Sequence, residues 1–199
     1  MFNRRGFLAA MTLGALAGLA GCSGEDKLEN LRGVALTDSA LGKGFALNGT
    51  DGQAHTLADF KGKVVMVFFG FTQCPDVCPT ALIRAVEVKQ KLGERGKNLQ
   101  VLFVTVDPER DTPEVLSAYV TAFDPSFIGL YGSPDQTRAT AKEYKVYYSK
   151  IPTGSSYTMD HTALSYVYDA EGKLRVALRH NQPIDDFVND IGAIMDLHG

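Results

Sequence analysis

The chain has few cysteines, no strong excess of charge of one sign, and no internal repeat. Three cysteines in 199 residues are too few for a fold held together by disulfides. Lys and Arg number 20 against 23 Asp and Glu, and the net charge of −3 comes without a basic stripe, which argues against nucleic-acid binding. An apolar share of 45% excludes intrinsic disorder. We therefore expect one globular domain with a hydrophobic core.

An export signal is predicted at the N-terminus. A pair of arginines precedes an apolar run from Phe7 to Ala20. As a helix this run would be about 21 Å long at about 1.5 Å per residue, short of the roughly 30 Å needed to cross a bilayer. The residues Leu19 to Gly21 before Cys22 resemble a bacterial lipobox, in which the cysteine is acylated and becomes the first residue of the mature protein. Residues 1–21 are thus predicted to be a lipoprotein signal peptide.

The surroundings of this signal predict where the protein works. Arg4-Arg5 also resembles a twin-arginine signal, which would imply export in the folded state. Residues 22–43 begin with small and polar side chains and are interpreted as a tether between lipid and domain. We expect the protein at the cell envelope of a bacterium, facing the periplasm and anchored to the membrane through Cys22.

Residues 44–199 are predicted to form the domain, beginning with alternating strands and helices. The apolar run Val64–Phe69 is bounded by glycines and predicts a central strand buried on both faces. Apolar residues then recur at helical spacing after Pro79. A second strand is predicted at Leu99–Val106, and a second helix from the cap at residues 111–114 to about Phe123.

The C-terminal half predicts a hairpin and a last helix. The pattern indicates a strand at Phe127–Tyr131, a helix at Asp135–Tyr144, an antiparallel pair at 163–169 and 173–179, and a final helix begun near Pro183. This order predicts an α/β, thioredoxin-like fold with a central mixed sheet flanked by helices and an N-terminal extension. The stretch 144–157 is too long for an ordinary connection, and we interpret it as an inserted mobile loop before the strand that follows His161.

Cys74 and Cys78 lie between the central strand and the next helix, at the sheet edge where α/β proteins bind ligands. The helix dipole and free backbone N–H groups there stabilise thiolate and bring a cysteine pKa from about 8.5 to roughly 3.5–7.5. Three residues separate the two cysteines, so a turn can bring the sulfurs together for a disulfide or for one metal ion. The spacing alone does not choose between these uses.

His161 is the candidate for a third ligand, because it directly precedes a predicted strand at the place where thioredoxins have a loop facing the dithiol. Two thiolates and one imidazole suit copper, whereas a closed zinc site would want a fourth Cys or His nearby. The side chain of Asp160 is equally suited to cap a turn or to orient His161 from outside the ligand set. The other histidines, at positions 55, 180 and 198, receive no role.

A further acidic segment, Asp107–Glu114, follows the second strand at the same edge of the sheet. Turn prolines and a helix cap are enough to explain it, and this interpretation is favoured. A carboxylate at Asp107 is nevertheless placed to assist the dithiol, and we keep it as a candidate outside the ligand set.

Three segments resemble signature motifs of the Sco/SenC family of membrane-anchored, thioredoxin-like proteins. Thr72–Pro79 is similar to the family's paired-cysteine motif, Val106–Pro113 to its second motif, and Asp160–Thr162 to its metal-binding histidine. The resemblance extends from about residue 45 to residue 197, and the combination of three motifs is specific.

The resemblance implies a copper metallochaperone for cytochrome c oxidase assembly. In such a protein Cys74, Cys78 and His161 would bind one copper ion, Cu(I) or Cu(II), and pass it to the dinuclear copper A centre. The implied partners are the copper A-bearing subunit of the oxidase and other periplasmic copper chaperones.

The alternative is a thiol–disulfide oxidoreductase in which Cys74 and Cys78 reduce the cysteines of the copper-accepting partner. Two departures argue against a general thioredoxin: three residues rather than two separate the cysteines, and no proline directly precedes Ala163. A thiol peroxidase is less favoured still, because its threonine lies three residues before the reactive cysteine, whereas Thr72 lies two before Cys74.

Overall fold

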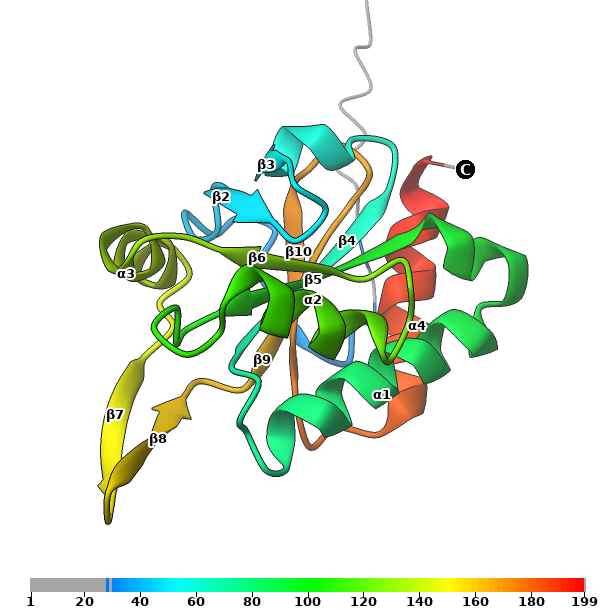
Figure 1. Ribbon diagram of the computed structural model, residues 1–199. Coiled ribbons are helices and arrows are strands. Elements are labelled where there is room, and N and C mark those ends of the chain that lie inside the picture. Colours follow the sequence, from blue (N-terminus) through cyan, green and yellow to red (C-terminus); the bar gives the residue numbers. More distant parts are fainter. Residues whose placement is uncertain (1–27, 29, 199) are drawn as a thin grey trace, which may run out of the picture.

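The computed structural model describes residue 28 and residues 30–198, which form a sheet flanked by helices (Figure 1). The sheet has eight strands in the order β1-β10-β9-β4-β5-β6-β2-β3. β4 (Val64–Gly70) is parallel to β5 (Leu99–Thr105) and antiparallel to β9 (Leu164–Tyr168). Every residue of β4 and β5 is buried, as their unbroken apolar runs predict. The mixed sheet and thioredoxin-like fold predicted from the sequence are confirmed.

The outer strands extend the sheet on both sides. β6 (Ile128–Tyr131) is parallel to β5, and β10 (Leu174–Arg179) pairs antiparallel with β9, as the hairpin signal predicted. The first strands in the chain are short and lie at the two edges of the sheet: β1 (Val34–Ala35) beside β10, and β2 (Ala46–Gly49) with β3 (Ala54–Thr56) beyond β6.

In the described part of the chain, four α-helices flank the sheet: α1 (Val77–Lys91), α2 (Pro113–Thr121), α3 (Pro134–Glu143) and α4 (Ile184–Met195). α1 and α4 contact each other, α2 lies against β6, and α3 lies near β2. Two of these helices have a hydroxyl side chain as N-cap. Thr112 caps α2 by accepting a hydrogen bond from the N–H of Val115, and Ser133 caps α3 in the same way. Short 3-10 helices at Leu57–Phe60, Gly93–Asn98 and Asp196–His198 complete the elements.

The N-terminal extension is bound to the domain over part of its length. Asp190 in α4 is fully buried and accepts hydrogen bonds from the backbone N–H groups of Arg32 and Gly33, at 2.8 Å each. β1 then pairs with β10. Residues 32–35 therefore contact the body of the domain although they precede the boundary predicted at residue 44, and a two-residue edge strand leaves no periodicity by which the sequence could show this.

The predicted signal peptide and Cys22 lie outside the described residues, as do residues 23–27 and 29 of the predicted tether. Within the described part of the chain, no helix is long and apolar enough to cross a membrane.

The stretch predicted to be a mobile loop is a β-hairpin. β7 (Tyr148–Thr153) and β8 (Ser156–His161) pair antiparallel and form a second sheet that projects from the body of the domain (Figure 1). Gly154, at φ +60°, supplies the left-handed turn between the strands. The side chains of β7 and β8 are mostly polar, so the alternation of apolar and polar residues by which strands are recognised is nearly absent. The loop prediction was therefore wrong.

Candidate metal centre

The two cysteines lie where β4 passes into α1. Cys74 is in the connecting turn and half-buried, whereas Cys78 is fully buried in the first turn of α1, which begins two residues earlier than the predicted start at Pro79. The backbone N–H of Cys78 donates to the Cys74 sulfur at 3.4 Å. Both thiols are free in the structure.

A glycine at the end of β4 makes room for the buried sulfur. A Cβ atom on Gly70 would lie 2.7 Å from the sulfur of Cys78 and 2.8 Å from the ring of Phe103, closer than side-chain atoms approach in proteins. The sulfur of Cys78 therefore packs directly on the backbone of β4, and the absence of a side chain at Gly70 is a requirement of the site.

His161, the last residue of β8, completes the group. Its Nε2 atom lies 3.5 Å from the sulfur of Cys78, and its Nδ1 lies 3.2 Å from the carbonyl oxygen of Thr162. A proton on Nδ1 would be donated to that carbonyl and would leave the Nε2 lone pair facing the sulfurs. The rings of Phe68 and Phe71 meet the imidazole edge-on, at 6.2 Å and 5.9 Å between centroids, and restrict its orientation.

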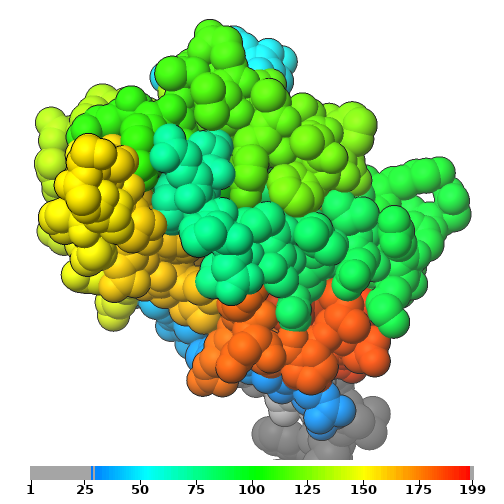
Figure 2. All heavy atoms as spheres, turned by 60° about the horizontal axis from the view of Figure 1, so that its bottom comes forward, coloured from blue at the N-terminus to red at the C-terminus, as the bar shows by residue number. Residues whose placement is uncertain are grey.

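The three ligand atoms of Cys74, Cys78 and His161 all lie within 4.8 Å of one another. Within the described residues this is the single group of three or more Cys, His, Asp or Glu side chains arranged closely enough to share a metal ion. In Figure 2 the cysteine segment lies beside the hairpin on one face of the molecule, although about 80 residues separate them in sequence. The sequence prediction of these three residues as one site agrees with this geometry.

The surroundings of the two cysteines favour a thiolate at Cys74 and a protonated thiol at Cys78. The Cys78 S–H hydrogen bond lowers the pKa of Cys74 to about 3, with smaller contributions from His161 and the backbone N–H groups of residues 76 and 78, while burial opposes them. The same hydrogen bond and burial raise the pKa of Cys78. At neutral pH the reduced site therefore holds one thiolate and one buried proton, which a soft cation would displace as it binds.

The two carboxylates considered as supports for the site do not touch the ligands in this structure. Asp160 is exposed, and the carbonyl of Thr162 lies at the Nδ1 position that a supporting carboxylate would occupy. Asp107 is buried, with 1% of its surface exposed, and accepts hydrogen bonds from Tyr157 and Arg110 rather than from either cysteine. Through the hydrogen bond from Tyr157, Asp107 contacts the hairpin that carries His161.

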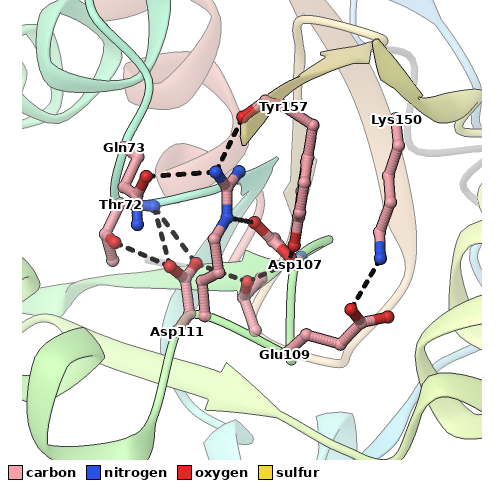
Figure 3. A network of polar contacts seen from close by, with 9 residues as sticks. Thr72, Gln73, Asp107, Glu109, Asp111, Lys150 and Tyr157 are labelled. Atoms are coloured by element: carbon pink, nitrogen blue, oxygen red, sulfur yellow. Dashed lines mark hydrogen bonds and ion pairs between the residues drawn. The ribbon is translucent and has the colours of Figure 1, made fainter. Parts of the chain in front are cut away.

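The segment after β5 contributes more than the predicted turns and helix cap. Asp111 is buried and accepts hydrogen bonds from the N–H and hydroxyl of Thr72 and, at 2.6 Å, from the hydroxyl of Thr105 (Figure 3). Burial raises the pKa of Asp111, while these donors oppose that effect. Asp111 thereby holds the start of the cysteine turn against β5, a role that the cap interpretation missed. The cap itself is Thr112.

Fold and site together define a class: a thioredoxin-like domain with a cysteine pair and a histidine placed to share one metal ion. The family model described as SCO1/SenC matches residues 34–196, so the chain belongs to the SCO1/SenC family.

Relatives with names and structures support this assignment. The mouse protein described as "Protein SCO1 homolog, mitochondrial" is 35% identical over 177 residues, 87% of this chain and 62% of its own length. A structure of Bradyrhizobium japonicum ScoI with copper bound is 38% identical, with a TM-score of 0.71, covering 78% of this chain and all of that one. Arabidopsis thaliana ScoI with copper bound is 34% identical, with a TM-score of 0.73 and coverages of 79% and 99%. The chain spans about half to two thirds of the length of the curated relatives it matches.

Proposed function

We propose that this protein is a copper metallochaperone that binds one copper ion through Cys74, Cys78 and His161 and delivers it to the dinuclear copper A centre of cytochrome c oxidase. The observation that carries the proposal is the convergence of these ligand atoms within 4.8 Å, in a chain 38% identical to a ScoI structure with copper bound. The family's association with cytochrome c oxidase assembly supports the choice of partner. Two sulfurs and one imidazole nitrogen form a soft set that suits Cu(I) and also admits Cu(II).

Differences in exposure suggest the order in which the ligands exchange. The half-buried thiolate of Cys74 is the group that an incoming copper ion or a partner thiolate meets first. Cys78 is enclosed and must release its proton as copper binds. His161 belongs to the hairpin, so its departure would open the coordination shell without unfolding α1 or β4.

The site of action is part of the proposal. Acylation at Cys22 would hold the domain at the outer face of a bacterial membrane, where the oxidase and other copper chaperones are accessible. Mass spectrometry of the mature N-terminus tests this, and a Cys22→Ala chain should leave the membrane fraction while keeping its copper affinity. An unmodified Cys22 would refute the anchor.

Copper binding is tested on the reduced chain from residue 23 onward, which includes every described residue. We expect one equivalent of copper, with a thiolate-to-Cu(II) absorption band that His161→Ala removes or shifts. His55→Ala is the matched control, because His55 pairs with Asp51 near the far edge of the sheet and should leave copper binding unchanged. Delivery is then measured as the appearance of the copper A spectrum in the soluble domain of the oxidase subunit. Native copper affinity in His161→Ala would refute the ligand set.

The second candidate is a thiol–disulfide oxidoreductase, and the unequal thiols favour it. The Cys74 thiolate would attack a partner disulfide, forming a mixed disulfide and releasing one partner thiolate. Cys78 would then lose its proton and attack the sulfur of Cys74, which releases the second partner thiol and leaves a Cys74–Cys78 disulfide. Reduction of the partner that survives His161→Ala, in a protein that binds no copper, would favour this function.

A further inference from the structure

The position of His161 depends on how the β7–β8 hairpin is held. Along β8 the side chains of Tyr157, Met159 and His161 share one face of the strand, and this face is less exposed than the other. Tyr157 lies four residues before His161, roughly 13 Å along the strand. A contact that holds the strand at Tyr157 therefore also limits how far His161 can move from the cysteines.

Arg110 makes that contact from the loop that follows β5. Its Nη1 atom donates to the carbonyl oxygen of Tyr157 at 2.7 Å and to the side-chain oxygen of Gln73 at 3.1 Å (Figure 3). Its Nε atom donates to the carboxylate of Asp107. The guanidinium also lies over the ring of Tyr157, 3.7 Å from the ring centroid.

One side chain thus joins three segments that are distant in sequence. Gln73 directly precedes the ligand Cys74, Asp107 follows β5, and Tyr157 belongs to the strand that ends in His161. The hydroxyl of Tyr157 closes the arrangement by donating to Asp107 at 2.8 Å. A planar guanidinium can serve these directions together, whereas a lysine ammonium is a single point charge on a flexible stem.

Burial distinguishes this link from an ordinary surface ion pair. The side chains of Arg110 and Asp107 are 17% and 1% exposed, so salt screens them little. The neighbouring pair between Lys150 of β7 and Glu109 is 43% and 58% exposed and is expected to contribute little.

We propose that Arg110 is a positioning residue that fastens the β7–β8 hairpin to the cysteine turn and so determines whether His161 reaches Cys74 and Cys78. The inference rests on the proposed copper site for its consequence, but the link itself exists in the metal-free protein. Loss of the link should free the hairpin while β4, β5 and α1 keep their packing. Copper would then be held by the two sulfurs with His161 only partly engaged.

The test compares Arg110→Ala with Arg138→Ala in the chain from residue 23 onward. Arg138 is a matched control, because it also pairs with a carboxylate three residues before it, Asp135, but is exposed and has no hydrogen bond to the hairpin. Without copper, backbone hydrogen exchange in β7 and β8 should be at least about tenfold faster in Arg110→Ala and unchanged in Arg138→Ala. With copper, the affinity should fall roughly 10–100-fold, the usual cost of losing a group that supports a metal ligand.

A spectroscopic signature separates positioning from a general loss of stability. The thiolate-to-Cu(II) band of Arg110→Ala should move toward that of His161→Ala, because copper loses the imidazole ligand in part in the first variant and completely in the second. Arg110→Lys keeps the charge and should restore the slow hydrogen exchange of the hairpin and the copper affinity only in part. If Arg110→Ala does not fold, Tyr157→Phe, which removes one hydroxyl of the same link, replaces it in the test.

Two results would overturn the proposal. One is unchanged hydrogen exchange in the hairpin together with unchanged copper affinity and spectrum. The other is faster exchange spread equally through β4 and β5, which would make Arg110 a general structural residue. If the unsubstituted chain binds no copper, the proposed function fails, and the hydrogen-exchange comparison still decides whether Arg110 fastens the hairpin.

Discussion

The thiol of Cys78 should control the charge of Cys74, and replacing it tests the electrostatics of the site. In the structure the Cys78 S–H hydrogen bond is the main reason that the pKa of Cys74 falls to about 3. Cys78→Ala removes this donor, while Cys78→Ser keeps a hydroxyl that can donate in its place. The two variants differ in one atom, and both remove the second sulfur.

The expected change in the pKa of Cys74 follows from the strength of the lost hydrogen bond. A hydrogen bond to a charged group contributes about 1.5–3 kcal/mol, and a pKa difference of one corresponds to about 1.4 kcal/mol. Cys78→Ala should therefore raise the pKa of Cys74 by about 1 to 2, whereas Cys78→Ser should keep it close to the native value. Because His161 and two backbone N–H groups still favour the thiolate, the pKa in Cys78→Ala should stay below the ordinary value of about 8.5.

The assay is a pH titration of thiolate absorbance in the ultraviolet, repeated as the rate of iodoacetamide alkylation. The sign of the linked stability is also defined. A lowered folded-state pKa at Cys74 stabilises the reduced protein fully above the unfolded value of about 8.5, and this contribution is lost as the pH falls toward about 3. A native titration near the ordinary cysteine value, or equal pKa values in the two variants, would refute the hydrogen-bond explanation.

Two further predictions concern packing and the N-terminal segment. Gly70→Ala should lower the free energy of unfolding by about 1–3 kcal/mol in urea titrations and raise the pKa of Cys74, because the added Cβ displaces the sulfur of Cys78; unchanged values of both would contradict this packing. Asp190→Ala should lower the free energy of unfolding by about 2 kcal/mol, since the N–H groups of Arg32 and Gly33 lose their acceptor. Asp190→Asn, which keeps one oxygen, should lower it less. Equal unfolding midpoints for the native chain and Asp190→Ala would show that the segment is not fastened there.

Much of the fold follows from local patterns in the sequence. β4 and β5 are detectable because their residues are buried on both faces and form unbroken apolar runs. The starts of helices α2 and α3 are predictable because each has a cap residue followed by proline. The hairpin β7–β8 was not predicted because its strands are mostly polar and pair chiefly with each other. They therefore lack the alternation of apolar and polar residues by which a strand is recognised.

The attachment of the N-terminal segment to the domain was not predicted, for a related reason. The backbone N–H groups of Arg32 and Gly33 are held by a carboxylate 158 and 157 residues away in sequence. Neither the hydropathy nor the composition of the N-terminal segment contains that information, because the partner is a single buried aspartate on the last helix.

The sequence by itself determined the chemistry available at the site. Two cysteines between a buried strand and a helix N-terminus, and a histidine before a later strand, define a soft ligand set whatever the details of packing. The tertiary structure alone decided which thiol carries the charge, because Cys78 is enclosed against Gly70 while Cys74 remains half-exposed.

The tertiary structure also decided what holds the site together. Arg110 reaches Gln73 and Tyr157 across 37 and 47 residues of sequence, and Asp111 reaches Thr72 across 39. Sequence patterns report the local periodicity of an element and its immediate ends. The meeting of these side chains depends instead on the register of β4 against β5 and on the place where the hairpin folds back, which only the assembled sheet establishes.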